Sequence, residues 1–264
     1  MKTAGFIGTG KMGGALALSV IAKIGGENVL LSDNFIEKAH QIAGESGAVC
    51  TDAIEVSKKC EFIFLGVKPQ VIEDTLNSIK DALKENKDAV LVSMAAGVKT
   101  KRIESILGFE CPIIRIMPNT AVAVSAGTTV YSPNDKVTND KIEMFCYLLS
   151  LSGILERIDE ELIDAAMAVS GCGPAFVYYF INALKEGGVE CGLDEGLSLK
   201  LAEQTLLGAA KLAIESKKDP KELQNDVCSK GGATIEGIYV LENENADKTV
   251  KKAVKAAFDK AKKL

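Results

Sequence analysis

The chain has 264 residues, which is enough for one large domain or two smaller domains with their own hydrophobic cores. With 47% hydrophobic and 25% charged residues and a formal net charge of −5, it has the composition of an ordinary globular protein, without a basic field for nucleic acid or for an anionic membrane. We expect no signal peptide after Lys2, and no apolar run approaches the roughly 20 residues that span a bilayer.

The first predicted elements are a buried strand over residues 4–7 and a helix over residues 12–24. Gly8, Gly10 and Gly13 lie between them with the spacing of a dinucleotide-binding loop. The first glycine allows a tight turn, the second lets a pyrophosphate approach the backbone, and the third lets the helix pack closely on the strand. The N–H groups at the start of the helix then face the phosphates. This arrangement predicts a dinucleotide site.

A second strand, over residues 28–34, ends in the polar residues Ser32, Asp33 and Asn34. Asp33 lies about as far beyond the loop as the acidic residue that binds the adenine ribose hydroxyls. Ser32 and Asn34 can instead hold a 2′-phosphate, which Asp33 would repel. Asp33 and Asn34 are also suited to cap a helix over residues 36–46. The sequence therefore leaves NAD and NADP both open.

Further strands are predicted over residues 60–67, 89–93 and 113–120, with a helix over residues 71–83. Lys68 follows the first of these strands, at the edge where ligands bind in open α/β sheets, although a solvated loop lysine fits its position equally well. The small residues at 94–97 suit either the approach of a ring or ribose or a tight turn. The alternation of strands and helices predicts a doubly wound, mostly parallel sheet.

Strands over residues 127–131 and 153–157, a turn over 132–135 and a helix over 141–149 are expected to complete this sheet. Strand signals disappear from residue 159 onward, and helical spacing replaces them. We therefore predict two domains: a Rossmann-type dinucleotide-binding domain over residues 1–158 and an all-α domain over residues 159–264.

Two helices of the second domain, over residues 175–184 and 197–214, are apolar on more than one face. Such helices are covered either by a partner chain or by the first domain. The lysine-rich C-terminal stretch is predicted to be a solvated helix rather than a nucleic-acid patch.

Two glycine-rich segments, over residues 170–174 and 227–234, each precede a predicted helix. Both are expected to expose backbone N–H groups at a helix start, where a small carboxylate can bind. Thr234 adds a neutral hydroxyl that can form a hydrogen bond with a nitrogen atom. The alternative is a close crossing of helices, with Thr234 as a capping residue.

The seven cysteines are scattered and include no C-x-x-C pair, which favours a reducing cytoplasm with free, mostly buried thiols. His40 is the single histidine of the chain, so a histidine-rich metal site is excluded and no metal is expected.

These motifs resemble the pyrroline-5-carboxylate reductase family essentially from end to end. The resemblance implies NADPH- or NADH-dependent reduction of 1-pyrroline-5-carboxylate to L-proline, the final step of proline synthesis. It also implies a homodimer, able to assemble further, with a small-molecule substrate. The matching segments are F-I-G-x-G-x-M-G over 6–13, V-K-P over 67–69, A-A-G over 95–97, R-x-M-P-N-T over 115–120, L-I-D over 162–164, G-x-G-P-A over 171–175 and G-G-x-T over 231–234.

The resemblance also implies site residues. Thr234 matches the catalytic hydroxyl that contacts the ring nitrogen, and Glu160 matches a substrate-contacting position, although it is equally suited to start a helix. The implied substrate-binding residues are Glu160, Gly231, Gly232, Ala233 and Thr234. The implied cofactor-binding residues are Gly8, Thr9, Gly10, Lys11, Met12, Gly13, Ser32, Asp33, Asn34, Val67, Lys68, Pro69, Met94, Ala96 and Asn119.

The sequence departs from the family pattern at Cys172, Cys228 and Lys230 near the glycine-rich segments, and at Ala53 and Asp226 near the expected cofactor. Two alternatives follow. A β-hydroxyacid dehydrogenase would need a lysine near the G-x-G-P turn, but Lys185 lies more than two helical turns beyond it. A dinucleotide-sensing dimer without turnover is the other alternative.

Overall fold

An eight-stranded sheet forms the centre of the N-terminal part of the computed structural model, which describes residues 2–263. The strand order is β3-β2-β1-β4-β5-β6-β7-β8, and every neighbouring pair is parallel except β6 and β7. The order reverses between β1 and β4, which is where open α/β sheets bind ligands. The predicted doubly wound sheet is therefore confirmed. The strands are β1 (Lys2–Ile7), β2 (Val29–Ser32), β3 (Val49–Cys50), β4 (Cys60–Leu65), β5 (Val90–Ser93), β6 (Ile113–Pro118), β7 (Gly127–Pro133) and β8 (Gly153–Arg157).

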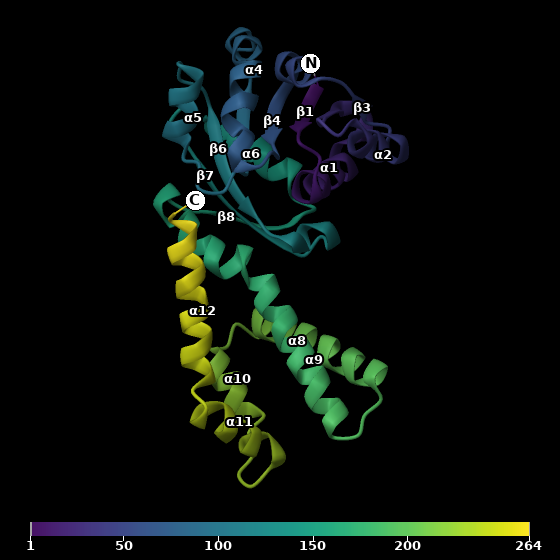
Figure 1. The fold of residues 1–264 in the computed structure, drawn as a ribbon, viewed down its shortest axis with the longest axis vertical. Helices are drawn as coiled ribbons and strands as arrows, with labels where there is room; N and C mark the ends of the chain where they lie inside the picture. The colour runs from purple at the N-terminus through teal and green to yellow at the C-terminus, as the bar shows by residue number, and fades with distance from the viewer. Residues whose placement is uncertain (1, 264) are drawn as a thin grey trace. The chain divides into compact units, whose positions relative to one another are not determined.

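Helices cover both faces of the sheet and enclose two hydrophobic cores (Figure 1). On one face, Leu16 of α1 packs with Phe6 and Phe64, whose rings stack with centroids 4.5 Å apart. On the other face, Leu76 of α4 packs with Ile63. Neighbouring strand residues enter opposite cores because side chains alternate along a strand. The helices are α1 (Lys11–Ile24), α2 (Ile36–Ser46) and α6 (Asn139–Leu148) on the first face, and α3 (Ala53–Lys59), α4 (Ile72–Glu85) and α5 (Thr100–Leu107) on the second.

Several short elements were not predicted. β3 has two residues and α3 has seven, so neither is long enough to show a clear period. The helix α5 was not predicted either, because it is short and buries only Thr100, Ile103 and Leu107. The turn predicted over residues 132–135 is wrong at its start, because Ser132 and Pro133 still pair with β6.

The segment after β8 is helical but belongs with the sheet. It comprises a short 3-10 turn (Glu160–Leu162), α7 (Ile163–Ala166) and a π-helical turn (Met167–Gly171). Contacts divide the chain into one unit that extends to Cys172 and includes the residues from Ala257 onward, and a second unit over Gly173–Ala256. The domain boundary predicted after residue 158 stays a prediction, while the contacts place the division after Cys172.

The predicted glycine loop over residues 170–174 is not a loop. The π-helical turn runs to Gly171, and α8 (Gly173–Glu190) starts directly after Cys172. The Cys172 N–H donates to the Met167 carbonyl over 2.8 Å. This N–H is therefore not free for a carboxylate, contrary to the expectation from the sequence.

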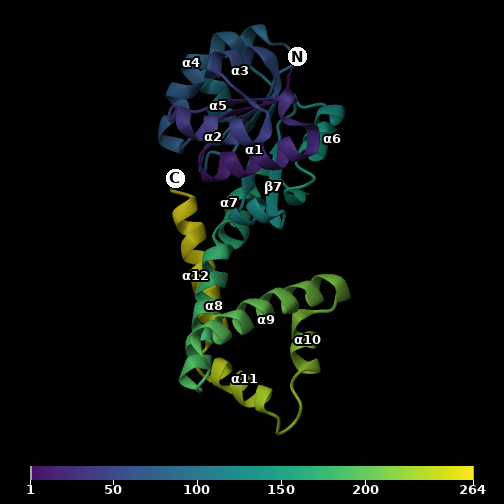
Figure 2. The ribbon, with the colours of Figure 1, turned by 90° about the vertical axis from the view of Figure 1, so that its right-hand side faces the viewer.

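The second unit is entirely helical (Figure 2). α8 and α9 approach closely, since a Cβ added to Gly188 would lie 2.2 Å from the Ser198 hydroxyl oxygen, and that hydroxyl donates to the Lys185 carbonyl over 2.7 Å. The helices after α8 are α9 (Glu195–Ser216), α10 (Pro220–Asp226), α11 (Ala233–Asn243) and α12 (Ala246–Ala261), whose last residues belong to the first unit.

Large apolar side chains of this unit lie exposed in the single chain, although the sequence predicts covered faces. Those of α8, α9 and α11 are Val177, Tyr178, Tyr179, Phe180, Leu184, Val189, Leu197, Leu199, Leu201, Leu207, Leu212, Ile214, Tyr239, Val240 and Leu241.

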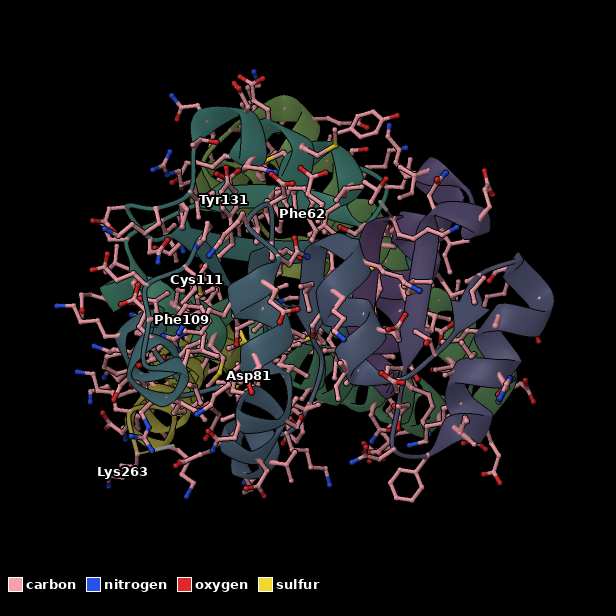
Figure 3. All side chains as sticks on the ribbon, turned by 90° about the horizontal axis from the view of Figure 1, so that it is seen from above. Phe62, Asp81, Phe109, Cys111, Tyr131 and Lys263 are labelled. Atoms are coloured by element: carbon pink, nitrogen blue, oxygen red, sulfur yellow. The ribbon has the colours of Figure 1, made fainter. Side chains whose placement is uncertain are left out.

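All seven cysteines are free thiols, as predicted, but the expectation that most are buried is wrong. Only Cys60 is fully buried, and Cys191 is exposed. Burial raises the pKa of Cys60 and of Cys111 to about 12, so these two thiols stay protonated at neutral pH. Figure 3 labels Cys111 and Phe109, which both pack against the second core.

Candidate active site

Gly8, Gly13 and Gly66 hold the ends of β1 and β4 close to the start of α1. Gly8 has a φ of +95°, a conformation that favours glycine. A Cβ added to Gly13 would lie 2.0 Å from the Gly8 carbonyl oxygen, and one added to Gly66 would lie 2.3 Å from the same atom. Gly10 has a φ of −63°, and no atom lies within 4 Å of an added Cβ. The geometry therefore agrees with the predicted roles of turn, open approach and close packing.

We expect alanine to have different effects at Gly13 and at Gly10. Gly13→Ala places its methyl group on the Gly8 carbonyl, so it should lower the free energy of unfolding by about 2 kcal/mol. Gly10→Ala fits the free chain but fills the space through which a pyrophosphate approaches. It should leave the melting temperature unchanged and weaken dinucleotide binding about tenfold or more. Thermal unfolding and fluorescence titration check both variants. An equal loss of stability in the two would contradict this assignment.

A cavity of about 540 Å³ opens beside the glycine loop, at the carboxyl ends of β1, β2 and β4. Its volume is in the range of small-molecule sites. The open space at Gly10 and the polar residues that end β2 fit the phosphate and adenosine parts of a dinucleotide. The predicted cofactor residues that line this cavity are Gly8, Gly10, Ser32, Asp33, Asn34, Val67 and Lys68.

Other predicted cofactor residues lie next to this cavity without lining it. Thr9 and Lys11 border a second cavity of about 730 Å³, which follows α1 and α2 and includes residues of the turn after β6. Met12 belongs to the first turn of α1, as does Gly13. Pro69 starts the 3-10 turn after β4.

Met94 and Ala96 follow the carboxyl end of β5. The Met94 N–H donates to the Leu65 carbonyl over 3.3 Å, which places Met94 beside the end of β4. Ala96 packs against a small core that contains Met117 and Ile163. Both residues therefore lie at the edge of the sheet where the cofactor is expected, and their contact with it stays a prediction.

Asn119 braces the backbone beyond the end of β6. Its side-chain oxygen accepts hydrogen bonds from the N–H groups of Ala121 and Thr128, each over 3.2 Å. Its side-chain nitrogen donates to the Ser170 carbonyl over 3.1 Å. Asn119 is 8% exposed, so its side chain has a structural role, and the predicted contact with the cofactor remains untested.

A buried charge cluster that the sequence analysis missed surrounds Arg115 in the middle of β6. Arg115 is 1% exposed; its Nη2 donates to the Asp164 carboxylate over 3.1 Å, and its Nη1 lies 3.6 Å from Glu160 Oε1. The sequence contains one indication of this cluster, because Arg115 is the single charged residue in the otherwise apolar strand IIRIMP. A buried arginine needs carboxylate partners. The cluster fixes the segment after β8 to the sheet.

Glu160 also receives hydrogen bonds from the start of α5. Its Oε1 accepts from the Thr100 N–H over 2.8 Å, and its Oε2 accepts from the Thr100 hydroxyl over 2.9 Å. Both oxygens are thus occupied within the first unit. These contacts with Thr100 and Arg115 give Glu160 a structural role. Contact between Glu160 and a substrate stays a prediction.

Gly231, Gly232, Ala233 and Thr234 form the start of α11 in the second unit. Gly231 has a φ of +72°, and Gly232 is the N-cap residue without a side-chain hydrogen bond to the helix. The Gly232 N–H donates to the Ser229 carbonyl over 3.0 Å. The first N–H groups of a helix have no partner within the helix. This start therefore offers the donors expected from the sequence, next to the exposed Thr234.

Two family models match the chain. Residues 3–97 match "NADP oxidoreductase coenzyme F420-dependent", and residues 160–264 match "Pyrroline-5-carboxylate reductase dimerisation". The first match contains the glycine loop and the 540 Å³ cavity, and the second contains Glu160 and Thr234.

Curated relatives match over nearly the whole chain. The pyrroline-5-carboxylate reductase of Aquifex aeolicus is 37% identical over 261 residues, which cover 98% of this chain and 96% of that protein. The enzyme of Escherichia coli is 35% identical and covers 100% of this chain and 98% of its own length.

Two solved structures, one named a pyrroline-5-carboxylate reductase and the other a pyrroline carboxylate reductase, are similar to this chain in fold. The structure from Coxiella burnetii has a TM-score of 0.92 at 32% identity and covers 99% of this chain and 98% of its own. The Plasmodium falciparum structure, with NADP bound, has a TM-score of 0.86 at 32% identity and covers 99% of this chain and 97% of its own.

Proposed function

This chain belongs to the pyrroline-5-carboxylate reductase family, and we propose that it reduces the C=N bond of 1-pyrroline-5-carboxylate to give L-proline through the residues described above. It is an NAD(P)H-dependent oxidoreductase of proline biosynthesis. One observation carries the proposal: a single chain that matches its relatives over nearly their whole length contains both the dinucleotide cavity and the Gly-Gly-Ala-Thr helix start.

The reaction requires a hydride at the imine carbon and a proton at the ring nitrogen. NAD(P)H, when bound, supplies the hydride. A protonated C=N bond is already electrophilic, so the protein chiefly positions the reactants and excludes water. We assign the phosphates to the glycine loop, the adenosine end to Ser32–Asn34 and the nicotinamide side to the ends of β4 and β5.

The start of α11 holds the substrate in this proposal. Its free N–H groups and the positive end of the helix receive the substrate carboxylate. Because the Gly232 N–H is already bonded to the Ser229 carbonyl, we assign the carboxylate to the N–H groups of Gly231 and Ala233. Lys230 places a positive charge next to this start. The Thr234 hydroxyl forms a hydrogen bond with the ring nitrogen and orients it during hydride addition.

The exposed apolar side chains of the second unit support a homodimer that can assemble further. The helical run Glu160–Glu190 is long and apolar enough to cross a membrane by length and composition, and 6% of the apolar window is buried. This finding overturns the expectation that no such run exists. A second copy accounts for the exposed surface, since the matching family model over residues 160–264 is named for dimerisation.

Light scattering at micromolar concentration should give the mass of two or more chains, and a monomer would contradict the proposed homodimer.

We place the enzyme in the cytoplasm, where a reducing environment suits its seven free thiols.

The homodimer proposed above also allows one site to be shared between two chains. If the apolar helices intertwine, the Thr234 loop of one chain serves the cofactor of its partner.

An assay with purified protein tests the function. Oxidation of NADPH or NADH should depend on added pyrroline-5-carboxylate. Absence of turnover with both cofactors at saturating substrate would contradict the proposal and favour a dinucleotide-sensing protein.

A further inference from the structure

The Asp33 carboxylate at the end of β2 is turned toward the glycine loop. Its Oδ2 accepts a hydrogen bond from the Thr9 N–H over 2.6 Å and a second one from the Thr9 hydroxyl over 3.0 Å. Its Oδ1 accepts from the Phe35 N–H over 2.8 Å. Thr9 is 4% exposed, so Oδ2 faces a buried partner.

These contacts use most of the hydrogen-bonding capacity of Asp33. An ionised carboxylate has about four acceptor positions, two on each oxygen. Thr9 occupies both positions on Oδ2, and Phe35 occupies one on Oδ1. A single position on Oδ1 remains, so the carboxylate cannot accept hydrogen bonds through both of its oxygens from a ribose diol without releasing the loop.

A second hydrogen bond ties the same two segments together. The Gly8 N–H donates to the Ser32 carbonyl over 2.8 Å. The end of β2 thus holds two successive residues of the glycine loop, one through its backbone and one through Asp33. Because Gly10 follows directly, this attachment sets the position of the backbone that faces the pyrophosphate.

We infer that Asp33 is a positioning residue for the glycine loop rather than the acceptor that selects NADH through its ribose hydroxyls. Asp33 therefore supports the binding of NADPH and NADH alike, through the position of the glycine loop. This inference rests on the proposed function for the identity of the cofactor.

Cofactor titrations of two substitutions and their combination test the inference. Asp33→Ala should raise the Kd of NADPH and of NADH by a common factor of about 10, because the loop loses charge-assisted hydrogen bonds. Thr9→Val, which removes the hydroxyl at nearly constant size, should raise both Kd values by a smaller factor. In the Asp33→Ala background, Thr9→Val should add almost nothing, because its partner is already gone.

Binding is followed by nicotinamide fluorescence, and the melting temperature of each variant is recorded. Asp33→Asn serves as a second variant of the same size: its amide has one oxygen and no charge, so it cannot accept from both Thr9 and Phe35, and it should raise both Kd values by a common factor no larger than that of Asp33→Ala. Asp194→Ala is the matched control, because Asp194 caps α9 in the second unit and should not affect either Kd.

The inference is overturned if Asp33→Ala weakens NADH about tenfold and leaves NADPH unchanged or tighter. It is also overturned if the effects of Asp33→Ala and Thr9→Val are additive. Failure of the unchanged protein to bind either cofactor would instead overturn the proposed function, so the two failures are distinguishable.

Discussion

Thr234→Val is expected to lower kcat for the reduction of pyrroline-5-carboxylate by about 100-fold, the usual effect of removing one hydrogen-bonding group from a transition state. Valine keeps the shape of threonine but has no hydroxyl group to orient the ring nitrogen. Thr234 is exposed at the first turn of α11, and the helix has no side-chain cap that the substitution would remove. The melting temperature and the Kd of NADPH should therefore remain unchanged.

Thr234→Ser is the matched control, because serine keeps the hydroxyl and loses only a methyl group. Its kcat should stay within about tenfold of the unchanged enzyme. Steady-state kinetics of the two variants separate the hydroxyl from the shape of the side chain. If Thr234→Val retains full kcat and raises only KM, the hydroxyl contributes to ground-state binding and not to the chemical step.

Arg115→Met is expected to lower the free energy of unfolding by about 3 kcal/mol, because it leaves two carboxylates near the sheet without their cation. Arg115 is 1% exposed and contacts Asp164 and Glu160, whose side chains are 18% and 20% exposed. For a protein of this size, the melting temperature should fall by about 10 °C. Scanning calorimetry at a fixed protein concentration measures the change, since association also affects stability.

Arg102→Met is the control for loss of an arginine at a surface ion pair. The Nη2 atom of Arg102 lies 2.7 Å from Oε2 of Glu73, and the two side chains are 57% and 56% exposed. Such a pair contributes less than about 1 kcal/mol. Equal melting temperatures for Arg115→Met and Arg102→Met would show that the buried cluster does not stabilise the fold.

The sheet and the glycine loop could be predicted from the sequence because local patterns determine them. Apolar runs of strand length alternate with helical periods, and Gly8, Gly10 and Gly13 each have a distinct steric requirement. The strand β2 was predicted as well, although the prediction extended it to residue 34 and the structure ends it at Ser32. The orientation of Asp33 was not predicted, because a carboxylate that binds its own loop and one that awaits a ligand have the same sequence.

Three features could not be predicted from the local sequence pattern. Arg115, Glu160 and Thr100 form their cluster across three separate elements, and only the lone charge in an apolar strand indicated it. The π-helical turn Met167–Gly171 has the glycines of a loop but forms a helical hydrogen bond at Cys172. The covered faces expected for α8 and α9 are exposed in the single chain, and we propose that a second copy covers them.

Transfer of deuterium from cofactor to product tests the proposed reaction most directly. Purified protein is incubated with pyrroline-5-carboxylate and NADPH or NADH that carries deuterium at the transferable position, and the product is analysed by mass spectrometry and NMR. The proposed function predicts L-proline with one deuterium at Cδ, the former imine carbon. Proline without this deuterium, or no proline with either cofactor, would contradict hydride reduction of the C=N bond by this protein.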